Sequence, residues 1–272
     1  MRIEPIRYYA KPQLPTRDVV DEHPELLRLL PRRWQANTTV VAALSACLAM
    51  AACSNADAAD RPTAVAPVFE HGKGSGSFGC SAVNPPIFLS EGDARQVIIE
   101  EAKRSGIRFS SDGRTLKDIT MPTNGTLARV DDGKGGAKWE PKSGTQVLSI
   151  PVDGLEMQRN IAFEYVSELD LKELKTGTTT WGMVTSHDTL GTARALAEGI
   201  GKTKPGGTYG VFYDPAIGWS DAYDTLKPID YSKGDWQTRG EMTRAAANRM
   251  AKEELRKQVQ DFIKWLKAQG VI

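Results

Sequence analysis

Three carboxylates form the first candidate catalytic group of this chain. Asp153 and Glu164 lie where β-branched and aromatic residues alternate around turn residues, and Glu100 lies earlier, where apolar residues recur at helical spacing. Carboxylates that meet from neighbouring elements can bind a divalent cation, which activates water for hydrolysis. One hypothesis is therefore metal-dependent hydrolysis through these three residues. The alternative is that Asp153 and Glu164 are solvated strand residues.

A cysteine and two histidines offer a second kind of chemistry. Cys80 could act as a nucleophile if His71 or His187 served as its base. A free cysteine is more often a small buried hydrophobic residue, and we favour that interpretation. His187 and Asp188 form a doublet that resembles the metal-binding pair of HD phosphohydrolases, but the further histidines of that family are missing. We expect Ser186 or Asp188 to cap a helix instead.

Gly74, Gly76 and Gly79 in HGKGSGSFGC have the G-x-G-x-x-G spacing of a dinucleotide-binding turn. Such a turn must open directly into a helix whose amides face the phosphates. Here Pro85 and Pro86 follow, and two prolines prevent a long helix at that point. We therefore expect no nucleotide cofactor and predict that this stretch is a flexible lead-in to the domain.

The composition narrows the classes of partner. The chain has 272 residues, 35 Lys and Arg against 34 Asp and Glu, and a formal net charge of +1. A chain without a strong net charge has no general attraction for nucleic acid, so we expect no nucleic-acid partner. The three cysteines include no C-x-x-C pair, which argues against a zinc site and against a disulfide scaffold.

The N-terminal segment has the composition of a secretory signal. Arg28, Arg32 and Arg33 precede residues 36–53, which contain no charged side chain. The apolar run is shorter than the ~20 residues that a helix needs to cross a membrane. We therefore interpret it first as a signal sequence, and second as an uncleaved anchor that keeps residues 1–34 in the cytoplasm.

Small residues before two cysteines make this segment similar to a bacterial lipoprotein signal, in which the cysteine that follows the lipobox is lipidated. Leu44-Ser45-Ala46-Cys47 matches the lipobox at each position, whereas Met50-Ala51-Ala52-Cys53 has Met at the aliphatic position. We favour Cys53, because it follows the longer apolar run and precedes a small, polar stretch suited to a tether. Cys47 is the alternative. The resemblance implies attachment to a membrane of the bacterial envelope, with the domain facing the periplasm or the exterior.

The remaining sequence predicts an α+β or three-layer α/β domain, with a small mixed sheet flanked by helices. We expect helices at residues 90–106 and 187–201, a hairpin over 146–170 that turns at Asp153 and Gly154, and a strand over 208–215. Residues 123–138 are rich in turn residues and predict an exposed excursion. Residues 241–270 predict a long amphipathic C-terminal helix.

This order of elements resembles the αβββαβ core of the restriction-endonuclease-like fold. The resemblance implies a metal-dependent nuclease or hydrolase in which Asp153, Glu164 and a helix carboxylate such as Glu100 or Glu101 hold the cation. That family places a lysine two residues after the glutamate, and here the position is Val166. An active nuclease of this kind would therefore need another residue to supply the positive charge of that lysine.

Taken together, the sequence predicts three parts: a signal or anchor segment over residues 1–53, a flexible tether over 54–67, and a single globular domain over 68–272. We expect a membrane-tethered lipoprotein whose domain binds or scaffolds an unidentified envelope ligand or protein and needs no cofactor. Four tryptophans in loop-like contexts could line a sugar or peptide groove, or fasten loops to the body. The alternative function is a hydrolase that uses Asp153 and Glu164, or Cys80.

Overall fold

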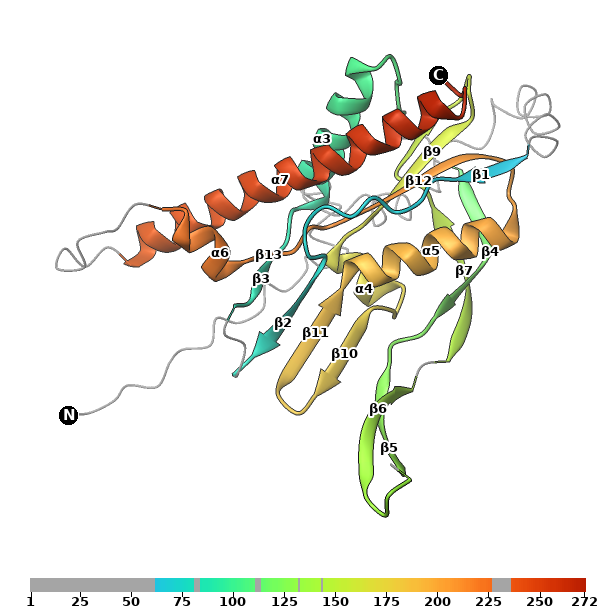
Figure 1. Cartoon of the computed structure of the whole chain (residues 1–272). Coiled ribbons are helices and arrows are strands. Elements are labelled where there is room, and N and C mark those ends of the chain that lie inside the picture. Colours follow the sequence, from blue (N-terminus) through green and yellow to red (C-terminus); the bar gives the residue numbers. More distant parts are fainter. Residues whose placement is uncertain (1–61, 81–83, 111–113, 132, 143, 227–235) are drawn as a thin grey trace, which may run out of the picture. The chain divides into compact units, whose positions relative to one another are not determined.

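The computed structural model describes residues 62–80, 84–110, 114–131, 133–142, 144–226 and 236–272 (Figure 1). These residues belong to one compact unit, Ser54–Ile272. Cys47, Cys53 and most of the expected tether lie outside the described residues. Within the described part of the chain, no helix has both the length and the apolar content that a membrane crossing requires.

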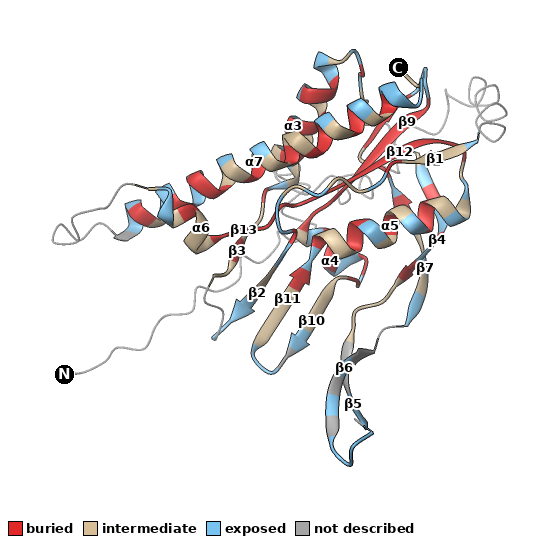
Figure 2. Cartoon of the chain, in the orientation of Figure 1, coloured by how far each residue is buried: buried red, intermediate tan, exposed pale blue. Residues whose placement is uncertain are grey.

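A four-stranded mixed sheet is the centre of this unit. Its strand order is β1 (Thr63–Val65), β12 (Gly207–Tyr213), β9 (Ile161–Val166) and β8 (Gly154–Glu156). The first three strands are parallel, and β8 is antiparallel to β9. Every residue of β9 and β12 is buried (Figure 2). Strands that are buried along their whole length need cover on both faces of the sheet.

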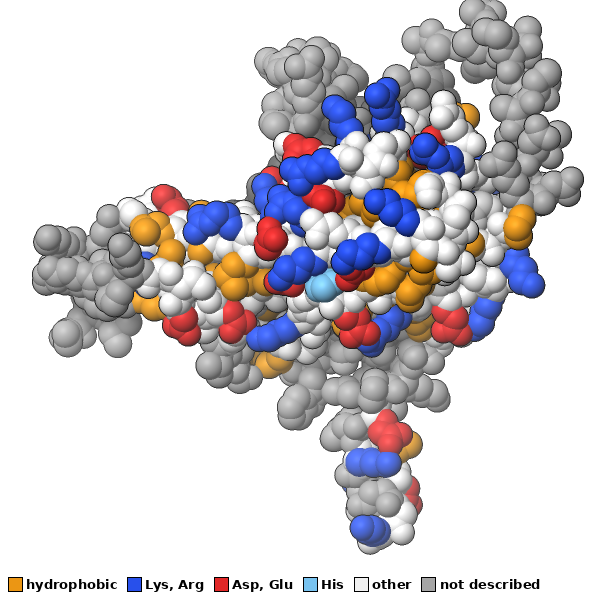
Figure 3. Space-filling view, turned by 45° about the horizontal axis from the view of Figure 1, so that its top comes forward, with side chains coloured by type: hydrophobic (Ala, Val, Ile, Leu, Met, Phe, Trp, Pro, Cys, Tyr) orange, Lys and Arg blue, Asp and Glu red, His pale blue; other side chains and the backbone are white. Residues whose placement is uncertain are grey.

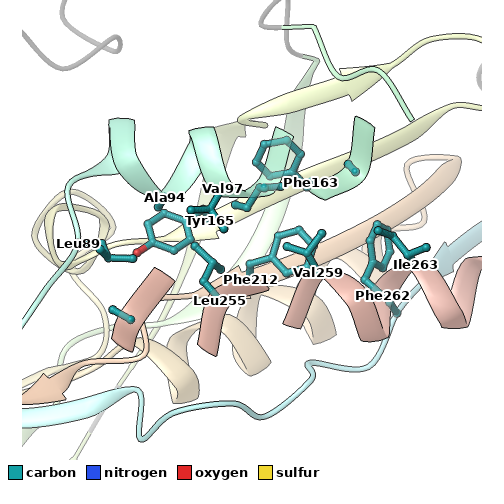
Figure 4. Close-up of a cluster of buried hydrophobic side chains, with 14 of the residues drawn as sticks. Leu89, Ala94, Val97, Phe163, Tyr165, Phe212, Leu255, Val259, Phe262 and Ile263 are labelled. Carbon is teal, nitrogen blue, oxygen red and sulfur yellow. The ribbon is translucent and has the colours of Figure 1, made fainter. Parts of the chain in front are cut away.

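Helices α3 (Glu91–Arg104) and α7 (Trp236–Ala268) cover one face. Figure 4 shows the aromatic side chains of the sheet packed against both helices. The rings of Phe212 on β12 and Phe262 on α7 meet edge to face, with centroids 5.5 Å apart. Each fully buried side chain of this size stabilises the fold by roughly 1.5–3 kcal/mol. The apolar face predicted for the C-terminal helix is therefore its contact with the sheet.

Helix α5 (Thr189–Thr203) and an antiparallel pair, β4 (Thr115–Pro122) with β7 (Thr145–Pro151), cover the other face. Their buried side chains pack against Ala162, Val166 and Val211 of the sheet. A mixed sheet between helical layers confirms the predicted fold class, including the long C-terminal helix.

The hairpin expected over residues 146–170 was wrong in its strand pairing. Strand β7 pairs with β4, and only β8, after Asp153, turns back onto β9. The β4–β7 pair buries Leu116, Ile119 and Ile150 against the α5 side of the core, which a pairing of β7 with β9 would not do. Distant apolar contacts therefore decided which strands are partners.

Residues 123–138, expected to be an exposed excursion, include β5 (Thr126–Asp131) and the start of β6 (Ala137–Lys142), which pair with each other. This hairpin continues outward from β4 and β7 (Figure 1). The residues of β5, β6 and their turn whose burial is described are exposed. The exposure was therefore predicted correctly, and the regular pairing was not.

The stretch expected to be a flexible lead-in is instead strand β2 (Ser75–Gly79). It pairs with β11 (Val184–Asp188), which pairs with β10 (Thr178–Trp181). A Cβ at Gly74 would lie 2.6 Å from the Tyr213 ring, and a Cβ at Gly76 would lie 2.6 Å from Pro86. The glycines of the motif thus serve close packing, not phosphate binding.

Short elements complete the unit. β3 (Pro86–Ile87) pairs with β13 (Ile217–Gly218), and the short helices are α4 (Glu168–Glu173) and α6 (Trp219–Asp224). Strand β1 lies inside residues 54–67, the segment expected to be a tether, and Ala66 directly after it is only 2% exposed. The domain therefore begins earlier than residue 68, because β12 takes β1 as a partner.

The outer surface of α7 carries both signs of charge. On the face seen in Figure 3, Lys and Arg side chains are interspersed with Asp and Glu. Lys252 on α7 pairs with Asp93 on α3 at 2.6 Å, and Lys257 pairs with Glu254 at 2.8 Å. Exposed pairs of this kind contribute little to stability, at most about 1 kcal/mol each.

Candidate functional site

A cavity of about 280 Å³ lies where the end of β4 and the loop that follows it, the loop after α4, strands β10 and β11, and the start of α5 come together. We call it the hydroxyl cavity, because six of the residues that line it are Ser or Thr. The lining residues are Pro122, Thr123, Gly125, Thr176, Gly177, Thr178, Thr179, Ser186, Asp188, Gly191 and Thr192. Small polar side chains from four separate segments thus surround one space.

Two glycines allow these segments to meet. Gly177 has a φ of +67°, and a Cβ there would lie 2.1 Å from the Thr192 hydroxyl. A Cβ at Gly191 would lie 2.2 Å from the Asp188 carboxylate. Glycine is therefore required for the loop after α4 to approach the start of α5.

Asp188 is the N-cap of α5, as expected from the sequence. Its Oδ1 accepts a hydrogen bond of 2.7 Å from the Gly191 amide. Its own amide donates to the Gly177 carbonyl at 2.8 Å, and its carbonyl accepts a 2.7 Å bond from the Thr192 hydroxyl. These bonds fix the carboxylate at the wall of the cavity while leaving the side chain exposed.

A row of hydroxyl groups crosses the three-stranded sheet on the cavity side. The register places Thr179 of β10 opposite Ser186 of β11, and Ser186 opposite Ser77 of β2. The Ser77 and Ser186 hydroxyls are 2.8 Å apart. Side chains directly opposite one another in paired strands share one face of the sheet. This row therefore forms a polar floor for the cavity.

The loop between β4 and β5 is fastened to the body beside this floor. The Asn124 amide donates to the Lys175 carbonyl at 2.6 Å, and the Asn124 side chain accepts from the Thr178 amide at 2.9 Å. Gly125 and Thr179 form a parallel bridge. The wall contributed by this loop is thus held by contacts with the backbone of residues 175–179.

His187 and Asp188 do not form a metal-binding doublet. Consecutive residues of a strand point to opposite faces, so His187 lies away from the cavity. Its ring packs between Phe78 and Phe88, with centroids 5.4 and 5.8 Å away, and it is 7% exposed. Burial lowers the pKa of His187; the Glu168 carboxylate opposes this effect and the Lys172 ammonium adds to it. The imidazole is therefore a neutral core side chain near pH 7.

Asp153 and Glu164 do come together. The Asp153 amide donates to the Glu164 carboxylate at 3.1 Å, and the Asp153 carboxylate accepts from the Tyr165 amide at 2.8 Å. Glu164 is 2% exposed. Val166, which occupies the position of the nuclease lysine, is also buried, and its side chain carries no charge.

The third carboxylate does not join them. Along β9, Phe163 and Tyr165 belong to the core beneath α3 and α7, so Glu164 between them faces the opposite side of the sheet. Glu100 is exposed on α3 and accepts a hydrogen bond from Gln96. In the described parts of the chain, no group of three or more His, Cys, Asp or Glu side chains is placed to hold a metal ion.

Cys80 and the histidines lie apart. Cys80 is exposed and follows the end of β2, contrary to the buried position that we favoured. His187 pairs with Gly76, and four residues of extended chain beyond it place Cys80 roughly 13 Å further along. His71 precedes β2, and its Nε2 lies 2.7 Å from the Asp261 carboxylate of α7. Neither imidazole is therefore close enough to serve as a base for the thiol.

A buried network at the carboxyl ends of β9 and β12 was missed at the sequence level. Asp214 is fully buried and accepts hydrogen bonds from the Leu89 amide, the Ala216 amide and the Tyr165 hydroxyl at 2.7, 2.7 and 2.9 Å. Burial raises the pKa of Asp214 to about 6, although these hydrogen bonds lower it. The one sequence signal was an aspartate directly after the apolar strand, before Pro215.

In α/β sheets this edge is a common location for ligands. In this chain the carboxylates of Asp214, Glu91 and Asp170 lie at that edge. The Ser167 hydroxyl, the N-cap of α4, lies 3.0 Å from the Glu91 carboxylate of α3 and 2.8 Å from that of Asp170. Because these acidic groups face the starts of both helices, the arrangement disfavours an anionic ligand. The hydroxyl cavity is therefore the better candidate site.

The chain was compared with known proteins at three levels. No protein-family model matches it, and no match was found among the curated proteins or the solved structures. The site is therefore interpreted from its own geometry.

Proposed function

We propose that this chain is a membrane-tethered, extracytoplasmic bacterial lipoprotein whose domain binds a ligand in the hydroxyl cavity. The observation that carries the proposal is the cavity itself, which small side chains from four segments keep open. Its lining offers many groups that form hydrogen bonds and only one ionisable group, Asp188. A lining of this kind suits recognition of a ligand more than bond cleavage.

The positions of the candidate catalytic residues support binding over catalysis. Glu100 lies on the far side of the sheet from Glu164, and neither His71 nor His187 lies within reach of Cys80. Asp153 and Glu164 bind backbone amides beside them, which is a structural use of both groups. Among the described residues, the candidate groups of the hydrolase alternative therefore do not converge on one place.

The tether follows from the lipobox-like sequence, with Cys53 as the proposed lipidation site and Cys47 as its alternative. Residues 54–62 separate Cys53 from β1. An extended chain of this length spans at most about 30 Å. A lipid on Cys53 would thus keep the domain close to the membrane that holds it.

Mass spectrometry of the mature N-terminus, purified from membranes, tests the location. We expect a diacylglyceryl group on Cys53, which Cys53→Ser abolishes and Cys47→Ser leaves unchanged. A lipid on Cys47 would change the anchoring residue but would still support a membrane-tethered lipoprotein. An intact Met1 in the membrane fraction would overturn the cleaved-lipoprotein part of it.

Hydrolysis assays test the binding role. The purified chain is incubated with Mg²⁺ or Mn²⁺ and with nucleic-acid, ester and glycan substrates, and each reaction is repeated with a chelator. We expect that the wild-type chain, the Glu164→Gln variant and the Cys80→Ser variant will not differ in their turnover of any of these substrates. Turnover that one of these variants abolishes would show a hydrolase and contradict the proposal.

A further inference from the structure

We propose that the hydroxyl cavity binds a single neutral sugar ring, either free or as one unit of a glycan. This inference rests on the proposed function, because it names the ligand class of the same site. It follows from the size of the cavity, its charge, and the hydrogen-bonding capacity of its lining.

The size of the cavity favours a small ligand. Ligand pockets range from about 300 to 1,000 Å³. At about 280 Å³ the hydroxyl cavity is just below that range, so it suits one ring better than an extended molecule.

The charge of the cavity disfavours ionic ligands. Among the described residues that line it, none is Lys, Arg or His, and Asp188 is the one carboxylate. The Gly191 amide at the start of α5, which could attract an anion, already donates to Asp188 at 2.7 Å. An anionic ligand would therefore meet the negative charge of Asp188 in the wall of the cavity. A single carboxylate used as a helix cap is also a poor site for a hard cation.

The hydroxyl groups of the lining keep both donors and acceptors available. The Thr192 hydroxyl donates to the Asp188 carbonyl, which leaves its lone pairs to accept. The Thr123 hydroxyl accepts from the Gly144 amide at 2.9 Å, which leaves its proton to donate. A ligand hydroxyl needs one acceptor and one or two donors, and this mixed lining supplies both.

The Asp188 carboxylate is the strongest acceptor in the cavity. Oδ1 accepts from the Gly191 amide, and Oδ2 accepts no hydrogen bond from the residues that the structure describes. Hydrogen bonds to a charged acceptor are stronger than those between neutral groups. We expect Oδ2 to accept from a hydroxyl of the sugar, with the Thr179–Ser186 row beneath the ring.

Calorimetric titration of the full chain in detergent micelles tests this inference. The probes are glucose, galactose and N-acetylglucosamine as neutral rings, with glucuronate as the anionic match. We expect at least one neutral ring to bind, and glucuronate to bind at least tenfold more weakly than glucose. If a tri- or tetrasaccharide that contains the neutral ring binds and the free monosaccharide does not, the ligand is a glycan.

Two matched variants locate the site. Thr179→Val removes a hydroxyl from the cavity, whereas Thr180→Val removes one from the opposite face of the same strand, where it contacts Thr185. We expect the first to weaken sugar binding at least fivefold and the second to leave it unchanged. Asp188→Asn, which preserves a good N-cap, should weaken it as well.

Several outcomes would overturn the inference. These are preferential binding of glucuronate, equal effects of Thr179→Val and Thr180→Val, and failure of every sugar tested. The outcomes remain separable from those of the proposed function. A lipidated chain that binds none of the sugars would refute the ligand class alone. A sugar-binding chain with an intact Met1 would instead refute the lipoprotein assignment.

Discussion

The Tyr165 hydroxyl donates a 2.9 Å hydrogen bond to the Asp214 carboxylate, and both side chains are buried where β9 and β12 end. The same carboxylate oxygen accepts from the Leu89 amide just before α3. One charged group therefore joins two central strands to the start of a helix. Removing a partner from such a group leaves a buried charge incompletely satisfied.

We expect Asp214 to make stability depend on pH. Its folded-state pKa of about 6 lies above the ordinary value of 3.8, so the folded chain binds this proton more tightly than the unfolded chain. Its contribution is therefore fully present below about pH 4 and is lost as the pH rises through about 6. The difference is at most about 3 kcal/mol in the free energy of unfolding.

Urea unfolding at a series of pH values between about 4 and 7 measures this effect. Asp214→Asn removes the titration but also a charged acceptor, so we expect a less stable variant whose stability varies less over this interval. If the wild type and the variant show the same pH dependence, Asp214 does not titrate there.

Tyr165→Phe should destabilise the fold more than Tyr213→Phe. Tyr165 donates to a buried carboxylate, whereas the Tyr213 hydroxyl has only neutral partners, the carbonyls of His71 and Gly72 at 3.0 and 3.2 Å. A hydrogen bond to a charged group contributes about 1.5–3 kcal/mol, and one between neutral groups about 1 kcal/mol. Denaturant titration of both variants at pH 7 gives the comparison. Equal losses would indicate that Asp214 is protonated at that pH.

Thr178→Val should be close to neutral, within about 0.5 kcal/mol, or slightly stabilising. The Thr178 hydroxyl oxygen is buried and has no hydrogen-bond partner among the described residues, so replacing it by a methyl group loses no bond. Thr189→Val is the matched case, because the Thr189 hydroxyl lies 2.8 and 2.7 Å from the carbonyls of Gly74 and Asp214. We expect it to cost about 1–3 kcal/mol in thermal or urea unfolding. A large loss for Thr178→Val would reveal an ordered water at that hydroxyl.

Gly177→Ala should destabilise the chain more than Gly182→Ala. Both glycines have positive φ, +67° and +57°, so each substitution carries a conformational cost of about 1–2 kcal/mol. At Gly182 a Cβ would meet nothing within 4 Å, but at Gly177 it would collide with Thr192 and the Asp188 carbonyl. The additional loss should accompany weaker sugar binding, since the two walls of the cavity move apart. Equal melting temperatures for the two variants would contradict this close approach.

The helices show how much local sequence can determine. The helices expected from residues 90, 187 and 241 are α3, α5 and α7, and Asp188, one of the two expected caps, caps α5. Capping and amphipathic spacing act within a few residues, so they can be read from a single segment. The buried strand β12 was recognisable for the same reason, as a continuous apolar run before Pro215.

The candidate site was less predictable, because its parts come from distant segments. Local sequence did not show that β7 pairs with β4, that the glycine-rich stretch is a strand, or that Glu164 and Glu100 lie on opposite sides of the sheet. Thr179, Ser186 and Thr192 are ordinary residues in the sequence and become a cavity lining only after three elements pack together. The sequence by itself determined the three long helices and the class of fold, since those depend on neighbours along the chain. Strand partners and the cavity were decided by tertiary structure, because they depend on which apolar surfaces bury one another across long separations.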